Sequence, residues 1–131
     1  MTTETISSDA AEGAELLATA QQALGDLKAV DPVVLDVREL IAVMDWLLVA
    51  SGTSSRHVKS LADNVMVKAR EQGVRPLGVD GERVGEWVLV DFGDVVLHVM
   101  RPEVRQYYDL EKLWDEDVRA LVKQHRAQEE E

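Results

Sequence analysis

The sequence contains no cysteine among its 131 residues. This absence excludes disulfides, thiolate zinc sites and cysteine nucleophiles, and it fits a cytoplasmic protein in a reducing compartment. Aromatic residues are scarce as well, at 5% of the chain. No apolar run reaches the roughly 18 residues of a membrane span, so we expect no contact with a membrane. The first residues, MTTETISSDAAEGAE, lack the basic and apolar regions of a signal peptide.

The chain also has few basic residues relative to its acidic ones. The chain has 14 Lys and Arg against 25 Asp and Glu, which gives a formal net charge of −11. Such a chain repels phosphate backbones at long range, so we expect no direct, general nucleic-acid binding. The same charge attracts a basic protein partner. The histidines at 57, 98 and 125 are scattered without HxxxH spacing, which argues against a zinc site, and no other metal or cofactor is indicated.

The order of apolar segments predicts a single α/β domain, and the chain is long enough for one hydrophobic core. Helical periodicity, short β-branched runs and turn residues define the elements. The predicted order is a helix over 9–29, strands over 33–40 and 45–52, a helix from one of the hydroxyl residues 53–55 to Gly73, a brief strand at 77–79, a hairpin of 86–91 and 94–100, and short helices from Pro102 and within 109–114. This order predicts a mixed β-sheet flanked by helices.

The two ends of the chain differ from the middle. Residues 1–8 are polar, and we expect them to be disordered. Residues 9–115 form the predicted domain, and residues 116–131 form a charged helical tail that ends in an acidic run. No internal repeat or linker divides the chain.

The most informative stretch is EWVLVDFGDVVLHVM, residues 86–100. Side chains alternate between the two faces of a strand. With a simple turn register, Trp87 lies opposite His98, Asp91 lies opposite Asp94, and Gly93 takes a positive φ with a G1 bulge. One face is then apolar, and the other holds Trp87, Leu89, Asp91, Asp94, Val96, His98 and Met100. A bulge would shift this pairing by one residue and reassign the return strand.

Two interpretations of the mixed face stay open from the residues alone. Aromatic and methionine side chains inside a polar rim are typical of protein interfaces. Alternatively, a helix covers the face, and His98 is a hydrogen-bonded core histidine.

Catalytic interpretations are weaker. The triplet DFG lacks the other kinase motifs and is explained by a hairpin turn. The turn SGTSSRH, at residues 51–57, has the form of a phosphate cradle and of the Gly-Ser turn of nucleotidyltransferases. Those enzymes need two carboxylates on the next strand to hold Mg²⁺, and no DxD follows here. Helix capping accounts for the serines, and no catalytic residue is predicted.

Four segments, taken together, resemble the ribosomal silencing factor family, also called RsfS, YbeB or Iojap. They are SGTSSRHVKSLADNV, WVLVDFGDVVLHVM, RQYYDLEKLW and the earlier DW, and the resemblance runs from about Asp9 to Asp115. It implies a nucleotidyltransferase-like fold without catalytic carboxylates. It also implies binding to the large ribosomal subunit through ribosomal protein uL14, which sterically blocks joining of the small subunit and represses translation when nutrients are limiting, as in stationary phase.

The resemblance also implies site residues. Trp87 and Phe92 match the family's contacts with the ribosomal protein, and Asp91 and Asp94 match its flanking acids, which pair with basic groups. The strand positions beside them are His98 and Met100. The chain departs from the family pattern where Met44 stands in place of a common Thr and Trp46 in place of Phe or Met. These departures concern local packing.

Three functional classes therefore remain: a ribosome-binding factor that prevents subunit joining, a nucleotide-handling enzyme that uses the SGTSSR turn, and a large-subunit assembly factor without silencing. An exposed Trp and Met face would also permit a homodimer of the free protein.

Overall fold

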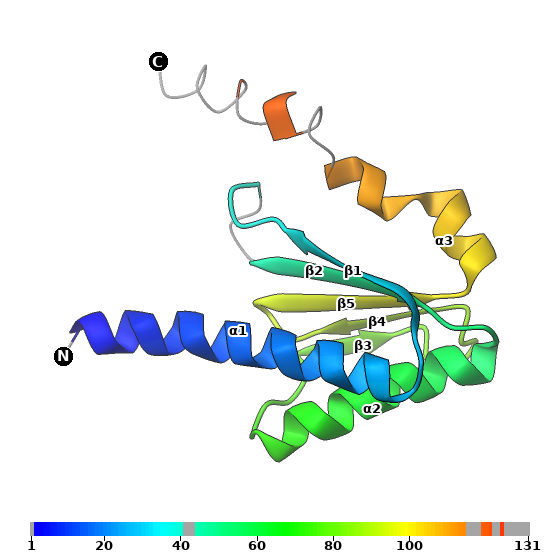
Figure 1. Ribbon diagram of the computed structural model, residues 1–131, viewed down its shortest axis with the longest axis horizontal. Coiled ribbons are helices and arrows are strands. Elements are labelled where there is room, and N and C mark those ends of the chain that lie inside the picture. The colour runs from blue at the N-terminus through cyan, green and yellow to red at the C-terminus, as the bar shows by residue number, and fades with distance from the viewer. Residues whose placement is uncertain (1, 41–43, 115–118, 122–123, 125–131) are drawn as a thin grey trace.

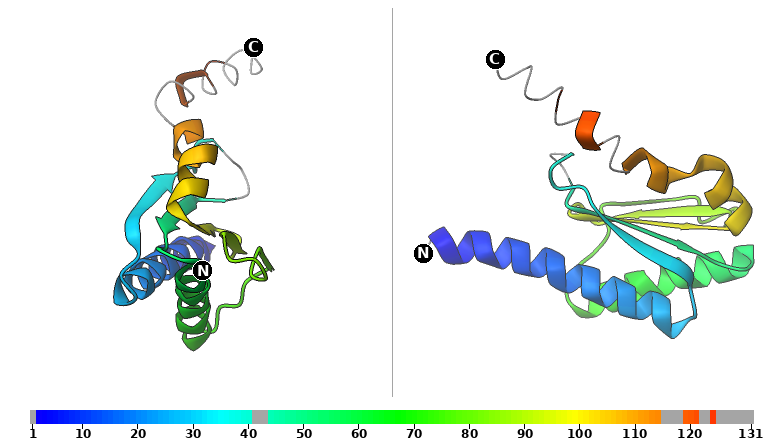
Figure 2. Two further views of the ribbon diagram at one scale, coloured as in Figure 1. Left: turned by 90° about the vertical axis from the view of Figure 1, so that its right-hand side faces the viewer. Right: turned by 45° about the horizontal axis from the view of Figure 1, so that its top comes forward.

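The computed structural model describes residues 2–40, 44–114, 119–121 and 124. A five-stranded sheet carries α1 and α2 on one face, and α3 lies on the other side of the sheet (Figure 1). Figure 2 shows the same arrangement from two further directions. The elements are α1 (Thr2–Asp26), β1 (Val30–Asp36), β2 (Trp46–Ser51), α2 (Ser55–Glu71), β3 (Gly78–Asp80), β4 (Trp87–Asp91), β5 (Val95–Met100), α3 (Pro102–Tyr108) and the 3₁₀ helix η1 (Leu110–Trp114).

The sheet is mixed, as the sequence predicted. Its strand order is β1-β2-β5-β4-β3. Strands β2 and β5 run parallel, and the other three neighbouring pairs are antiparallel. The β4–β5 hairpin thus lies inside the sheet, with β3 as one edge and β1 as the other. This arrangement confirms a single α/β domain with a mixed sheet flanked by helices.

Helix α1 differs from its predicted bounds at both ends. It begins at Thr2, where the sequence predicted a start at Asp9, because no Pro or Gly interrupts residues 2–12. It ends at Asp26, three residues before the predicted end, and Lys28 then takes a left-handed φ of 59°. The predicted tail over 116–131 lies largely outside the described residues, so the division into domain and tail stays a prediction.

Strand β1 was predicted at 33–40 and lies at Val30–Asp36 instead, so Pro32 is inside the strand. From the sequence, Pro32 was expected only to end the preceding helix. Proline is tolerated here because β1 is an edge strand and its pairing with β2 is irregular between Val30 and Val33. Asp31 takes a φ of 45° at this irregularity.

Helix α2 follows the prediction closely. The Ser54 hydroxyl caps it by accepting a hydrogen bond of 3.0 Å from the backbone N–H of His57. Gly73 follows the helix with a φ of 80°, the left-handed conformation that favours glycine after a helix end. The strand before α2 is therefore joined to it by a short capped turn, and the helix begins beside the sheet.

Buried side chains form one hydrophobic cluster on each side of the sheet. The larger cluster fills the space between the sheet and α1 and α2, and it includes Leu24, Leu48, Leu61 and Leu97. The smaller one, on the other face, contains Val37, Leu47, Val49, Val96 and Met100. Val104 of α3 and Leu110 of η1 pack against it. Truncating a fully buried leucine to alanine typically costs about 2–5 kcal/mol.

Candidate docking surface at the β4–β5 hairpin

The pairing of β4 with β5 is shifted by two residues from the predicted register. Trp87 lies opposite Met100 and Leu89 lies opposite His98, whereas the sequence analysis placed Trp87 opposite His98. The predicted pairing of Asp91 with Asp94 is wrong, because Asp91 pairs with Val96. A shift of two residues keeps every strand side chain on its predicted face. Asp94 is the exception: it lies in the turn, and a Cβ on Gly13 of α1 would lie 3.6 Å from its side chain, so it stands on the α1 side and not on the mixed face.

The turn explains the difference. The backbone N–H of Phe92 donates to the carbonyl of Val95 at 2.9 Å, which leaves Gly93 and Asp94 as a two-residue turn. Gly93 has the predicted positive φ, at 94°. The predicted G1 bulge is absent from the β4–β5 pairing, because a glycine of positive φ at the first turn position closes a tight hairpin without one. The Asp91 carboxylate accepts a hydrogen bond of 2.8 Å from the N–H of Gly93.

Trp87 is the centre of an aromatic group at one end of the mixed face. Its indole Nε1 donates a hydrogen bond of 2.9 Å to Nδ1 of His98. The Tyr108 ring, from the last turn of α3, lies with its centroid 4.8 Å from that of Trp87. Tyr107 stands edge-on to Tyr108 at 5.0 Å. We call these four residues the Trp87 cluster.

Burial fixes the ionisation of the histidine in this cluster. His98 is 8% exposed, and desolvation lowers its pKa to about 4. At neutral pH its ring is uncharged, so one nitrogen accepts a hydrogen bond from Trp87. His98 is thus the hydrogen-bonded buried histidine of the second interpretation. It supports a tryptophan that remains only half-buried.

The predicted site residues fall into two groups. Trp87 and Asp91 are half-buried, and Asp94 is exposed. Phe92 and Met100, by contrast, are 8% and 0% exposed. Phe92 belongs to the core beneath α1 and α2, on the opposite face from Trp87, and Met100 belongs to the smaller core. The structure therefore brings together Trp87, His98 and Met100 on one face, with Asp91 on the same face nearer the turn. It separates Phe92 from them, and it places the Asp94 side chain beside Gly13 of α1.

Sequence reasoning missed two exposed tyrosines and a leucine. Tyr107 and Tyr108 are 82% and 54% exposed, although their segment was interpreted only as a short helix and as part of the family resemblance, and neither tyrosine was predicted as a site residue. Leu77 is 76% exposed, and its backbone N–H donates to the Asp91 carbonyl, which places it beside the hairpin turn. The signal available in the sequence was the YY pair itself, since large aromatic rings are enriched where proteins meet.

The polar side chains of the SGTSSRH turn form hydrogen bonds that hold the fold together. Ser54 is used as the helix cap, and the His57 ring bonds both the Thr53 N–H, at 2.9 Å, and the Leu27 carbonyl, at 2.7 Å. The Ser51 hydroxyl accepts from Arg105 at 3.0 Å. These contacts join the segment after α1 to α2, and β2 to α3, so local structure accounts for the polar residues of the turn. Within residues 2–40, 44–114, 119–121 and 124, no group of three or more His, Asp or Glu is arranged to hold a metal ion.

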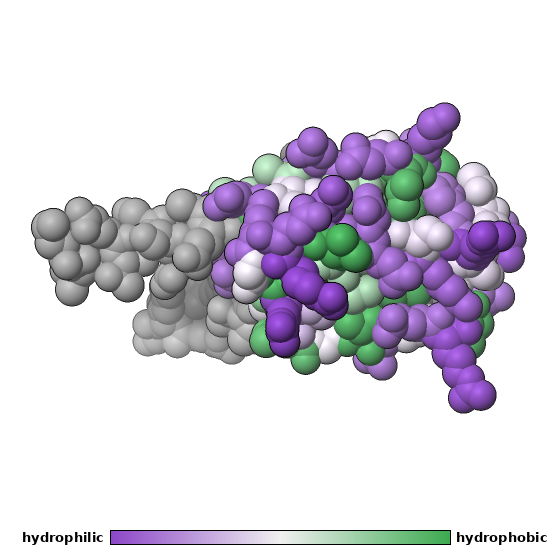
Figure 3. All heavy atoms as spheres, turned by 90° about the horizontal axis from the view of Figure 1, so that it is seen from below, coloured by the Kyte–Doolittle hydropathy of each residue, from purple (hydrophilic) through white to green (hydrophobic). Residues whose placement is uncertain are grey.

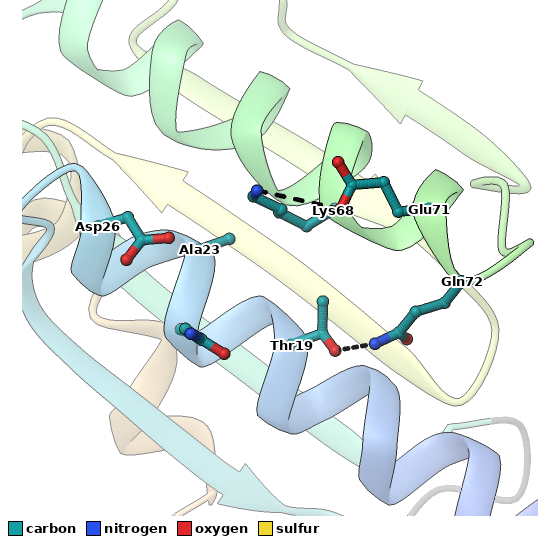
Figure 4. A pocket seen from close by; sticks show the side chains of 7 residues that line it. Thr19, Ala23, Asp26, Lys68, Glu71 and Gln72 are labelled. Atoms are coloured by element: carbon teal, nitrogen blue, oxygen red, sulfur yellow. Dashed lines mark hydrogen bonds and ion pairs between the residues drawn. The ribbon is translucent and has the colours of Figure 1, made fainter.

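A cavity of about 260 Å³ lies between α1 and α2, away from the hairpin (Figure 4). Two pairs of its lining residues contact each other: Gln72 donates to the Thr19 hydroxyl, and Nζ of Lys68 lies 3.9 Å from a carboxylate oxygen of Glu71. No helix in the part of the chain that the structure describes is long and apolar enough to cross a membrane.

Comparison with known proteins agrees with the fold. A ribosomal silencing factor RsfS from Chromobacterium violaceum is 50% identical over 100 residues, which cover 76% of this chain and 82% of the relative. The crystal structure of protein CV0518 from the same organism superposes with a TM-score of 0.75 at 50% identity, covering 76% of this chain and 83% of that one. A more distant relative is the mouse "Mitochondrial assembly of ribosomal large subunit protein 1", 34% identical over 64% of this chain and 38% of its own length.

These similarities define a class of small α/β proteins named for the ribosome. A family model described as "Ribosomal silencing factor during starvation" (RsfS) matches residues 10–131. The chain belongs to the RsfS family of ribosomal silencing factors, as the sequence motifs indicated.

Proposed function

We propose that this chain binds the large ribosomal subunit through ribosomal protein uL14, blocks joining of the small subunit by its bulk, and so represses translation when nutrients are limiting. The observation that carries the proposal is the Trp87 cluster. A half-buried tryptophan is held by a neutral histidine and flanked by a tyrosine, at the rim of the face predicted to dock. Rigid aromatic anchors of this kind contribute most of the binding energy at protein interfaces.

The contact set that we propose differs from the predicted one in three residues. Trp87, Asp91 and Asp94 remain direct contacts, and Tyr107, Tyr108 and Leu77 join them as exposed neighbours. Three predicted residues support the surface without contacting the partner, because their burial leaves little surface for it: His98, Phe92 and Met100. The acidic pair at the turn and the net charge of −11 suit a basic ribosomal protein.

We propose that the chain acts by binding and not as an enzyme. Two observations support this: the SGTSSRH hydroxyls already serve structural bonds, and the sequence supplies no carboxylate pair on the strand that follows. Steric blocking requires bulk in the right place and no chemistry. We place this activity in the cytoplasm, where ribosomal subunits join, and the aromatic surface would also permit a homodimer while the protein is free.

One relative favours a second function. The mouse protein is named for assembly of the ribosomal large subunit. An assembly factor would use the same docking surface, so it would bind large subunits without lowering the formation of joined ribosomes.

The test is sedimentation of purified large and small subunits with the wild-type protein, with Trp87→Ala and Tyr108→Ala together, and with Val67→Ala. Val67 is an exposed apolar residue on α2, and its truncation is the matched control. We expect wild type and the control to travel with the large subunit and lower joining, and the double variant to do neither while keeping its circular dichroism spectrum. Binding by wild type without loss of joining would instead support the assembly function. No binding by wild type would contradict both.

A further inference from the structure

The basic side chains of this acidic chain differ in whether they have an acidic or carbonyl partner. Several basic side chains are engaged with acids or carbonyls, namely Arg38 with Asp36, Lys68 with Glu71, Arg101 with Glu103, Arg105 with Glu111, and Arg119 with the Asp36 carbonyl. In the described part of the chain, five others within residues 56–83 have no hydrogen-bond or ion-pair partner for their side chains: Arg56, Lys59, Arg70, Arg75 and Arg83. Among the residues that the structure describes, most of the basic side chains without a partner thus lie in one segment.

Helical geometry puts three of these five on one stripe of α2. At about 100° per residue, Arg56, Lys59 and Arg70 fall within an arc of about 60°. The buried positions of the helix, Val58, Leu61, Ala62, Val65 and Ala69, fall on the opposite side. The stripe therefore points away from the sheet, and its one acid is Asp63. With a rise of about 1.5 Å per residue, it spans about 21 Å.

The other two cations lie near the two ends of this stripe. Arg75 follows Gly73, just beyond the end of α2. Arg83 belongs to the loop that returns to the first turn of the helix, since a Cβ on Gly85 would lie 2.6 Å from Cε of Lys59. Figure 3, which views the molecule from the side of α1 and α2, shows mostly hydrophilic side chains there, with small hydrophobic areas between them.

We propose that this basic surface, made of Arg56, Lys59, Arg70, Arg75 and Arg83, contacts ribosomal RNA phosphates once the Trp87 cluster has docked. The inference rests on the proposed function, because it requires attachment to the large subunit. The partner is chosen by charge complementarity: unpaired cations spaced along about 21 Å match a run of phosphates, and arginine suits phosphate geometry.

The net charge of −11 is compatible with this contact and limits it. At long range the whole chain repels RNA, so the basic surface does not recruit the protein to free RNA. At contact distance, ions at physiological strength screen charges beyond about 8 Å, and the local cations determine the interaction. The surface then adds affinity and fixes orientation after the protein contact has formed.

The experiment measures binding to purified large subunits between 50 and 200 mM salt. The test variant is Arg56→Gln with Arg70→Gln. The matched control is Lys28→Gln with Lys112→Gln, which removes the same charge from side chains outside the basic surface. Each phosphate contact contributes about 0.7–0.9 to the salt slope, so two contacts account for about ten-fold in affinity over this range. We expect the test variant to lose that part of the salt dependence and the control to retain it. Asp63→Asn should strengthen binding.

A second measurement separates this proposal from the proposed function. Binding to isolated uL14 should be unchanged in the test variant. Equal salt slopes for the test variant and the control would overturn the RNA contact while leaving the docking surface intact. Weaker binding of the test variant to isolated uL14 would make the basic surface a protein contact and also overturn it. If wild type fails to bind the large subunit at all, the proposed function fails, and this inference fails with it.

Discussion

The indole N–H of Trp87 donates to Nδ1 of His98 across two neighbouring strands, at 2.9 Å. The two residues are not directly paired, because Trp87 lies opposite Met100 and His98 lies opposite Leu89. The bond is therefore diagonal, and only a long donor and a long acceptor bridge that distance. It fixes the plane of the indole, whose other neighbour is the Tyr108 ring. A docking anchor held in this way loses little conformational freedom when a partner binds.

Replacing His98 with leucine should release Trp87. Leucine fills most of the space but offers no acceptor, so the partly buried indole N–H loses its partner at a cost of about 1–3 kcal/mol. We expect a lower free energy of unfolding in urea and a shifted, broadened indole N–H signal in NMR spectra. His98→Asn keeps an acceptor and serves as the control. An unchanged indole signal in His98→Leu would show that Tyr108 alone orients the ring.

The buried histidine should also make stability depend on pH. The folded state lowers the pKa of His98 from 6.5 to about 4, so the unfolded chain takes up this proton more readily. The stabilising contribution is complete above pH 6.5 and is lost as pH falls toward 4. The shift corresponds to about 3 kcal/mol. Urea unfolding between pH 7 and pH 4 should therefore show a loss that His98→Asn lacks.

The carboxyl group of Asp36 titrates at lower pH than His98. Hydrogen bonds from Arg38 hold the pKa of the half-buried Asp36 at about 2, down from 3.8. Its stabilising effect is present above pH 3.8 and is lost as pH falls toward 2. Since the two windows do not overlap, a loss between pH 6.5 and pH 4 that persisted in His98→Asn would contradict the assignment to His98.

The hairpin shows what the sequence determines and what it does not. Alternation assigned each strand residue to its face, because the period of two depends only on the extended backbone. The register depended on the turn, where the Phe92 N–H bonds the Val95 carbonyl, and no pattern in the sequence distinguished this turn from a bulged one. The same alternation, continued from Val88 through Val90, puts Phe92 on the core side. The family resemblance was used to place it at the docking surface instead, and its 8% exposure favours the core.

The Trp87 cluster depends on a tertiary contact that the sequence pattern does not predict. Trp87 was singled out as an isolated strand residue, and Tyr108 was placed only within a short helix. Their contact exists because α3 turns back over the sheet after Met100, and such a tertiary return has no local signature. Strand β1 gives a similar lesson, since Pro32 is acceptable there only because β1 lies at the edge of the sheet.

Arg105 should be important for the attachment of α3. Its guanidinium, in a side chain only 12% exposed, bonds Glu111 at 2.7 Å, Ser51 at 3.0 Å and the Val30 carbonyl at 3.3 Å. Arg105→Met keeps the apolar stem but leaves those acceptors unpaired, so we expect a loss of about 2–3 kcal/mol. Because α3 carries Tyr108, binding should weaken too.

The matched control for Arg105 is Arg101→Met. Within the described residues, the Arg101 side chain has an ion pair of 3.6 Å with Glu103 and no hydrogen bond at its buried Nε, so its replacement should cost less. Thermal unfolding followed by circular dichroism gives the comparison. Equal losses in the two variants would show that the Arg105 bonds do not hold α3 in place.

Two glycines with opposite surroundings provide a final test of how Trp87 is positioned. A Cβ on Gly81, whose φ is 85°, would lie 1.9 Å from the backbone carbonyl oxygen of Trp87, whereas a Cβ on Gly25 would meet nothing within 4 Å. Gly81→Ala should therefore displace the start of β4 and lower stability by at least about 1–3 kcal/mol. Gly25→Ala, inside α1, should be neutral or stabilising by up to about 1 kcal/mol. Because the added Cβ of Gly81→Ala would displace the backbone of Trp87, this variant should also bind large subunits more weakly. Full binding by a folded Gly81→Ala protein would show that docking does not depend on the position of Trp87.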